Sequence, residues 1–265
     1  MPLFSIRNLV KKFPGGLPGE EFPALDGVSL DIEEGRCMVI AGSNGSGKTV
    51  LMKIVAALLE PDSGEVIFRG EPLFGGRAGS RMRETERRLR GELGLVFQDA
   101  DAQIVGETVA EDAAFGPENL GFSPEQVRSR VDAALSSMGL GRMRERSPRR
   151  LSGGEKRRLA VAGVLASGCR TVIMDEPFAN LDWPGVLQVL EMIARLRKEG
   201  ITLLILTHEL EKVLAHADRL TILHAGRIRC DGLPGEVLDA LDPVWGVRDP
   251  RQGYAAVEDL TWLRR

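Results

Sequence analysis

The chain has 265 residues, and its 35 Lys and Arg residues against 38 Asp and Glu residues give a formal net charge of −3. This near balance argues against nucleic acid as the main partner, because binding a phosphate backbone usually needs a clear excess of basic residues. Hydrophobic residues make up 43% of the chain, as in a globular protein, and no run approaches the roughly 18 apolar residues of a membrane span.

Cysteine usage and the first residues of the chain favour a cytoplasmic protein. The first residues show no apolar core of signal-peptide length. The three cysteines, Cys37, Cys169 and Cys230, lie far apart and form no C-x-x-C pair. We therefore expect buried thiols in a reducing compartment rather than disulfides or a zinc site.

Three early segments alternate apolar and polar residues, as half-solvated antiparallel strands do. They are residues 5–10, 27–32 and 65–70. The glycine- and proline-rich residues 14–23 predict a loop. The early part of the chain therefore predicts an antiparallel β subdomain.

Four further runs are apolar on both faces, which is typical of buried parallel strands covered by helices. They are residues 38–42, 93–97, 171–175 and 202–207. Late in the chain, residues 219–232 predict a β-hairpin that turns at Ala225 and Gly226. We expect an α/β fold with a parallel sheet at its core.

Residues 98–158 carry helical patterns and no buried-strand run, which predicts a helical subdomain inserted between two strands. Within it, a Ser cap followed by Pro124 predicts a helix over residues 123–138. Two basic runs, residues 81–92 and 141–150, are interpreted as solvated surface, since the first interleaves Glu with Arg and has no aromatic residue.

Residues 42–49, GSNGSGKT, fit the phosphate-binding pattern G-x-x-x-x-G-K-[ST] between a predicted strand and a predicted helix. Glycines allow successive backbone amides to point at phosphate oxygens, and the helix directs its positive end at the same anion. The loop residues expected to bind phosphate are Gly42, Ser43, Asn44, Gly45, Ser46 and Gly47. Lys48 supplies a charge for the β- and γ-phosphates, and the Thr49 hydroxyl is a ligand for Mg²⁺. The pattern predicts a P-loop nucleoside triphosphatase with a RecA-like parallel core, the alternative being a glycine-rich turn that matches by chance.

Three residues at predicted strand ends complete the chemistry. Asp175 ends a buried strand and is expected to face the Mg²⁺, because ligands bind at the carboxyl ends of parallel strands. Its neighbour Glu176 is expected to polarise the water that attacks the γ-phosphate, and His208 to contact that phosphate. The alternatives are an acidic pair that caps a turn and a structural histidine.

A second glycine motif, LSGGE at residues 151–155, opens a helix just before the strand at 171–175. With the P-loop, Gln98, the Asp-Glu pair and the strand-end histidine in this order, it resembles the nucleotide-binding subunit of ABC transporters over residues 1–240. The resemblance implies that Ser152, Gly153 and Gly154 bind the γ-phosphate of ATP held by a second subunit. The working unit would be a dimer, with itself or with a related ATPase, and residues 241–265 would be an appendage.

The resemblance assigns further roles. It implies that Gln98 contacts Mg²⁺ or the attacking water, and that Asp182 lies in a loop that crosses the dimer. The adenine would stack on Phe13, with Phe22 as a rival because the intervening loop blurs the register. In the tail, Trp245, Tyr254 and Trp262 either pack on the core, which we favour, or seal a dimer contact.

Two positions depart from the family. Glu155 stands where Gln is common and Asn180 where Gly is common. Neither departure removes a catalytic group, so active ATP hydrolysis is expected.

Residues 96–127, with FGPEN and AGVLA at 115–119 and 162–166, resemble the energy-coupling factor type, which includes cobalt, nickel and vitamin uptake systems. This resemblance implies a transmembrane coupling subunit, a substrate-binding membrane subunit and a peripheral position on the cytoplasmic face of the cell membrane. A groove that receives the coupling subunit would involve Phe97, Asp99, Ile104 and Phe115.

Other functions remain open from the sequence. They are an ATPase of a different ABC importer class, a soluble ABC ATPase of DNA repair or translation, and a P-loop kinase or GTPase. The chain has neither the coiled-coil insertion of repair proteins nor the second P-loop of translation factors, and the LSGGE helix has no role in a kinase.

Overall fold

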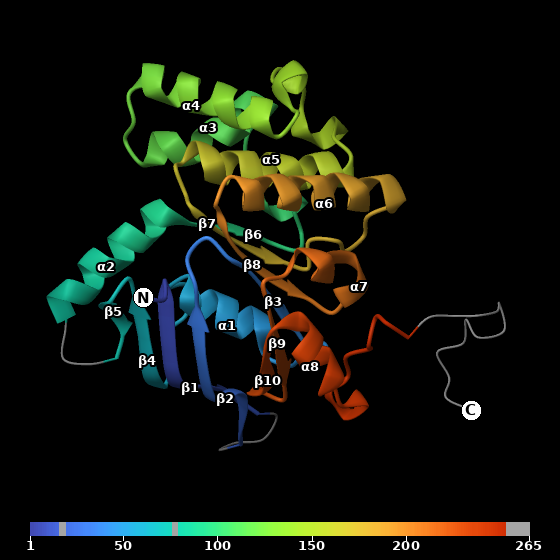
Figure 1. Ribbon diagram of the computed structural model, residues 1–265. Coiled ribbons are helices and arrows are strands. Elements are labelled where there is room, and N and C mark those ends of the chain that lie inside the picture. Colours follow the sequence, from blue (N-terminus) through green and yellow to red (C-terminus); the bar gives the residue numbers. More distant parts are fainter. Residues whose placement is uncertain (16–19, 76–78, 253–265) are drawn as a thin grey trace.

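An antiparallel sheet forms the first layer of the molecule. The computed structural model describes residues 1–15, 20–75 and 79–252, and Figure 1 shows this sheet beside the helix that follows the P-loop. Its strand order is β2 (Glu21–Ile32), β1 (Phe4–Pro14), β4 (Ser63–Phe68), β5 (Glu71–Phe74). The three predicted antiparallel strands are confirmed, and β5 adds a short edge strand that the pattern did not predict.

The prediction that residues 14–23 form a loop is wrong at both ends. Strands β1 and β2 pair as far as Pro14 and Glu21, with Phe13 opposite Phe22. Backbone hydrogen bonds to a partner strand override the local preference of glycine and proline for loops, which decides only the turn itself.

A six-stranded sheet forms the core of the molecule. Its order is β10 (Arg227–Gly232), β9 (Arg219–His224), β3 (Cys37–Ala41), β8 (Thr202–Thr207), β7 (Thr171–Asp175), β6 (Leu93–Val96). The four predicted parallel strands lie side by side, as expected. The predicted hairpin is confirmed and extends this core sheet, since β9 pairs parallel to β3 and antiparallel to β10.

Burial on both faces explains why these strands are continuously apolar. Met38 and Ile40 of β3 face a core shared with α1 (Lys48–Val55) and the antiparallel sheet, whereas Val39 and Ala41 face a core shared with the helical layer. Helix α1 therefore lies between the two sheets, and its first two residues, Lys48 and Thr49, are the last two of the P-loop motif (Figure 1). Because the parallel strands are in register, their carboxyl ends meet at one edge.

The helices form a third layer over the core sheet (Figure 1). They are α3 (Val109–Asn119), α4 (Pro124–Ser137), α5 (Gly153–Ala166) and α6 (Trp183–Lys198), with α2 (Gly79–Glu92) beside the antiparallel sheet. The predicted helix at 123–138 is confirmed as α4, whose Ser123 cap forms a reciprocal pair with Gln126.

Short elements connect these layers. They are η1 (Asp101–Gln103), η2 (Gly141–Met143), η3 (Pro148–Arg150), α7 (Leu210–Val213), η4 (Leu214–His216), α8 (Pro234–Asp239) and η5 (Pro243–Trp245). The three cysteines are free thiols; Cys37 and Cys169 are buried, as expected, whereas Cys230 is only half-buried. The start of the tail packs on the core through Trp245 and Val247, while Tyr254 and Trp262 lie outside the described residues. Within the described ranges, no helix is long and apolar enough to cross a membrane.

Candidate active site

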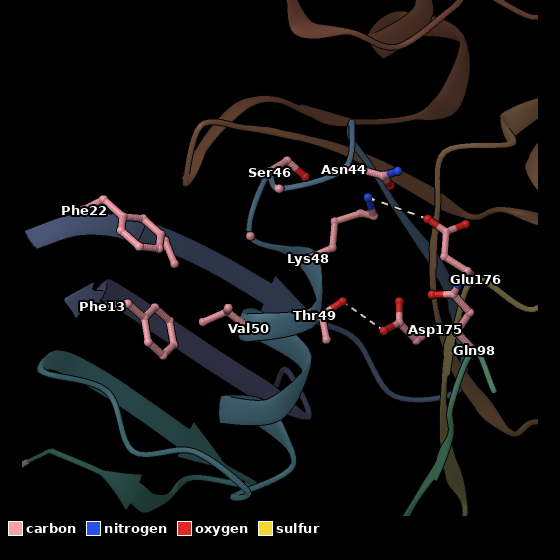
Figure 2. A pocket seen from close by; sticks show the side chains of 13 residues that line it. Phe13, Phe22, Asn44, Ser46, Lys48, Thr49, Val50, Gln98, Asp175 and Glu176 are labelled. Carbon is pink, nitrogen blue, oxygen red and sulfur yellow. Dashed lines mark hydrogen bonds and ion pairs between the residues drawn. The ribbon is translucent and has the colours of Figure 1, made fainter. Parts of the chain in front are cut away.

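A cavity of about 300 Å³ opens where the carboxyl ends of the core strands meet the antiparallel sheet (Figure 2). Its lining residues come from β1, β2, the P-loop, α1 and the ends of β6 and β7. They are Phe13, Phe22, Ala24, Asn44, Gly45, Ser46, Gly47, Lys48, Thr49, Val50, Gln98, Asp175 and Glu176. The fold thus brings most of the predicted nucleotide-binding residues to one place, although they are up to 163 positions apart in the chain.

The P-loop backbone requires glycine at two positions. Gly47 has φ of 107°, and a Cβ there would lie 2.4 Å from the Ala24 carbonyl oxygen. A Cβ at Gly42 would lie 2.2 Å from the Leu223 carbonyl oxygen. These close approaches pack the loop between β2 and β9, so that its backbone amides are fixed at the N-terminal end of α1.

Lys48 is a buried cation that the protein only partly neutralises. Its Nζ donates to the carbonyl oxygens of Gly42 at 2.7 Å and Ser43 at 3.2 Å, and lies 3.7 Å from Glu176 Oε1. Burial lowers the pKa of Lys48, while the carboxylates of Glu176 and Asp175 act in the opposite direction. A buried ammonium held at the base of a polar cavity favours an anionic ligand.

Thr49 and Asp175 place two oxygen ligands side by side. The Thr49 hydroxyl donates to Asp175 Oδ2 at 2.9 Å (Figure 2). Burial raises the pKa of Asp175, which the Thr49 hydrogen bond opposes. In the described part of the chain, no group of three or more His, Cys, Asp or Glu residues could hold a metal alone. The pair therefore fits Mg²⁺, which binds proteins through one or two oxygens and completes its shell with phosphates and water.

Glu176 is held in a strained conformation at the end of β7. Its φ is 47°, in the left-handed region that is sterically costly for a residue with a side chain. Its amide donates to the Leu206 carbonyl oxygen at 2.8 Å, and its carboxylate Oε1 lies 2.9 Å from His208 Nδ1. His208 does not line the cavity, and its closest polar partner is this carboxylate.

Gln98 lines the cavity from the end of β6, as predicted, whereas the second glycine motif lies elsewhere. Ser152, Gly153, Gly154 and Asp182 are absent from the cavity's lining. In this chain the Ser152 side chain caps α5, and Asp182 Oδ1 accepts from the Gly185 amide at 2.9 Å to cap α6. A single chain therefore does not bring these four residues to its own cavity.

Both candidate aromatic residues face the cavity. The rings of Phe13 and Phe22 lie 6.1 Å apart at 32° to each other, on paired positions of β1 and β2. Phe22 is 53% exposed. The sequence posed a choice between the two, and the strand pairing places both on the same side of the cavity (Figure 2).

The two departures from the family have local explanations. The Glu155 carboxylate accepts from the Ser152 amide at 2.7 Å and completes a capping box, which either Glu or Gln can do. Asn180 has φ of 58°, and asparagine tolerates this region better than most residues.

Sequence reasoning missed one support of the P-loop. At the tip of the β9–β10 hairpin, the Gly226 amide donates to the Ser46 carbonyl oxygen at 3.0 Å, and its carbonyl accepts from the Asp26 amide at 2.9 Å. The turn at Ala225 and Gly226 is visible in the sequence, but its contact with a loop 180 positions away is not.

A second cavity, of about 400 Å³, lies between β6, α3 and α5, and we call it the apolar groove. It is lined by Arg90, Leu93, Gly94, Gln103, Ile104, Val105, Asp112, Phe115, Gly116, Asn119, Leu120, Ala160, Gly163, Val164, Ser167 and Cys169. Of the four residues predicted for a groove, Ile104 and Phe115 line it. Phe97 and Asp99 do not line it, and Asp99 Oδ1 instead accepts from the amides of Asp101 and Ala102.

Residues 25–179 match the sequence pattern of a family described as ABC transporter. The match covers more than half of the chain, so the chain belongs to the ABC transporter ATP-binding family.

Three relatives share this family. A Halobacterium salinarum protein, provisionally named an ABC transporter ATP-binding protein, is 41% identical over 94% of this chain and 100% of its own length. The cobalt import ATP-binding protein CbiO of Rhodobacter capsulatus and the energy-coupling factor transporter ATP-binding protein EcfA1 of Clostridium novyi are each 39% identical over 89% of this chain and 81% of their own lengths.

Solved structures agree. CbiO1 of Clostridium perfringens, described as part of an ABC transporter complex, has a TM-score of 0.79 at 32% identity and covers 90% of this chain and 91% of its own. A dimeric ATP-binding cassette bound to ADP and phosphate has a TM-score of 0.73 at 25% identity, over 87% of this chain and 98% of its own. The chain is an ABC ATPase, an enzyme that hydrolyses ATP coupled to transport, and it resembles the energy-coupling factor type.

Proposed function

We propose that this chain energises an energy-coupling factor type importer for a metal ion, such as cobalt or nickel, or for a vitamin. The observation that carries the proposal is the apolar groove, which is lined by Gln103, five residues after Gln98. Three large apolar side chains at the groove are exposed in the chain by itself, Val105 at 60%, Phe115 at 54% and Leu120 at 45%. The similarity to CbiO and EcfA1 supports the choice of transporter type.

The groove is structurally connected to the active site. Gln103 lines the groove, and its side chain accepts from the Phe97 amide at 3.2 Å and donates to the Leu95 carbonyl oxygen at 2.8 Å. Phe97 directly precedes Gln98, so a partner that enters the groove would press on the segment that carries the glutamine. This connection supports a membrane partner whose movement is coupled to ATP.

The proposed chemistry assigns one task to each residue. Lys48 and the P-loop amides bind the phosphates of ATP. Thr49, Asp175 and Gln98 would hold Mg²⁺, which neutralises charge on the phosphates when bound. Glu176 takes up the proton of the attacking water, and its contact with His208 holds the carboxylate in place.

We propose that a second ATPase subunit completes the site. Its Ser152, Gly153, Gly154 and Asp182 would reach the γ-phosphate from the opposite side, since in one chain these residues do not line the cavity. The start of α5 supplies backbone amides and a positive helix end for this anion. Closing of the dimer then aligns the reacting groups, which couples ATP binding to hydrolysis.

The remaining parts follow from this assignment. Residues 98–158 would form the helical subdomain that meets the membrane partner, and residues 241–265 an appendage to the ATPase domain at 1–240. The partners would be a transmembrane coupling subunit and a substrate-binding membrane subunit. The chain would be a peripheral protein on the cytoplasmic face of the membrane.

Co-purification from native membranes tests the proposal. The tagged chain should bring down multi-span membrane proteins, and Phe115→Asp should release them because it places a charge in the apolar groove. Leu58→Asp is the control, since Leu58 is also exposed, at 59%, but does not line the groove. Cells that carry the chain and its partners should then take up labelled cobalt, nickel or a vitamin, and Phe115→Asp should abolish that uptake. Equal recovery of membrane proteins with both variants would contradict the proposal.

A further inference from the structure

Arg157, near the start of α5, is a buried cation. It is 5% exposed, although arginine is rarely buried unless it is paired. Among residues 1–15, 20–75 and 79–252 it forms no ion pair, and its Nε has no hydrogen-bond partner. Burial lowers the pKa of Arg157, an effect that the nearby Asp99 opposes. A buried cation held this way is unfavourable unless its contacts serve another purpose.

Its contacts are two backbone carbonyl oxygens from different parts of the chain. The Nη2 group donates to the Ala179 carbonyl oxygen at 2.6 Å and to the Gln98 carbonyl oxygen at 3.2 Å. The Ala179 amide in turn donates to the Glu176 carbonyl oxygen at 3.1 Å. One guanidinium group therefore connects the segment that holds Gln98 with the turn that holds Glu176.

The two residues beside Arg157 in the sequence, Lys156 and Arg158, do not connect the Gln98 segment with the Glu176 turn. The Lys156 ammonium pairs with Asp101, three residues beyond Gln98. Arg158 donates to the Met138 carbonyl oxygen at 2.8 Å and to Gln188 Oε1 at 3.1 Å. In this run of three basic residues, the middle one joins both segments to α5.

We infer that Arg157 is a positioning residue that holds the start of α5, the segment after β6 and the turn after β7 in one arrangement. The inference rests on the roles proposed above for Gln98, Glu176 and Ser152. Through Arg157, a shift of the Gln98 segment would move both the general base in this chain and the α5 start that serves the opposite site.

The geometry of the guanidinium group explains why arginine is needed. Its planar set of donors can serve two carbonyl oxygens at fixed angles, whereas a lysine presents a compact charge on a flexible chain. Hydrogen bonds from a charged donor are stronger than neutral ones, and their loss would leave two carbonyl groups without this partner. Lysine at this position should therefore restore only part of the function, and methionine none.

The test compares Arg157→Met and Arg157→Lys with Arg130→Met in the full chain. Arg130 lies in the same helical layer, where it donates to the Ala166 carbonyl oxygen at 3.3 Å and lies 4.0 Å from the centre of the Phe122 ring. It contacts neither segment, so its loss controls for a general loss of packing. Three quantities are measured: kcat and KM for ATP, the melting temperature, and amide hydrogen exchange at residues 97–103 and 176–182.

We expect Arg157→Met to lower kcat at least about tenfold, since small misplacements of catalytic groups have effects of this size, with KM within about twofold. Exchange should become faster in both segments together. Arg157→Lys should be intermediate, and Arg130→Met should keep the parent kcat even if its melting temperature falls equally.

A kcat for Arg157→Met within twofold of the parent would overturn the inference, as would an equal loss in Arg130→Met or faster exchange confined to α5. Because these readouts use ATP turnover and exchange alone, they decide the inference even if no membrane partner is found. The co-purification experiment, in turn, decides the proposed function irrespective of Arg157.

Discussion

Glu176→Gln tests the assignment of the general base most sharply. The substitution keeps the size of the side chain and removes one charge and the ability to accept a proton. A glutamine can still accept a hydrogen bond from His208, which lies 2.9 Å from the present carboxylate. The change is therefore chemical rather than steric.

The expected magnitude follows from the contacts of the carboxylate. A positioned general base contributes about 10² to 10⁴ in rate, or about 3 to 5 kcal/mol of barrier. The attraction to Lys48 Nζ at 3.7 Å is about 4 kcal/mol at an effective dielectric of about 20, but removing the buried carboxylate also removes its desolvation penalty. Lys48 keeps its two carbonyl partners and loses the nearer of the two carboxylates that offset its charge, while Asp175 remains. ATP affinity should therefore be equal or higher.

The assay combines a binding isotherm for ATP, single-turnover hydrolysis and size-exclusion chromatography. We expect turnover to fall at least about 100-fold, ATP affinity to be retained, and a dimer to persist in the presence of ATP. Turnover within tenfold of the parent would refute the role of Glu176 as the base. Normal turnover by a monomer would refute the shared site as well.

Two further predictions concern the proposed metal ligand Asp175 and the rings expected to stack on the adenine. Burial raises the pKa of Asp175, so this residue destabilises the fold increasingly as the pH rises above the ordinary pKa of aspartate, and the penalty is complete above the raised pKa. Asp175→Asn keeps an acceptor for Thr49, and the nucleotide-free variant should be more stable than the parent at pH 7 in urea denaturation, while needing more Mg²⁺ for half-maximal turnover. The stability difference should shrink as the pH falls toward the ordinary pKa of aspartate, and a growing difference would contradict the reasoning. Phe13→Ala and Phe22→Ala should each weaken ATP binding, as measured by calorimetry. The expected loss is about 1 to 3 kcal/mol, which is what a ring that stacks on a nucleotide base contributes. Unchanged affinity in both variants would exclude stacking on this pair.

The core of the fold was predictable because its signals are local. Strands β3, β7 and β8 are buried on both faces, so each reads as an unbroken apolar run. The early hairpin was harder, because cross-strand pairing extends β1 and β2 into residues whose own preference is for loops. The short strand β5 was missed because it lies at a sheet edge and carries only one buried residue.

The site divides in the same way. Motif spacing places residues 44–49 and Asp175 at the cavity because they follow one another in one loop or end a strand, whereas Gly42 and Ser43, which were also predicted to bind phosphate, do not line it. The contacts that support them join distant segments, as between His208 and Glu176 or between Arg157 and Ala179. No pattern in the sequence encodes such pairs, because the fold alone determines which turns come into contact.

The central claim is that two subunits share each ATP. Specific ATP turnover of the purified chain, measured over a dilution series that spans the monomer–dimer transition, tests it most directly. Turnover per subunit should rise with concentration and vanish in the monomer, because Ser152 to Gly154 do not line the chain's own cavity. Constant turnover per subunit down to dilutions at which the chain is monomeric would contradict it.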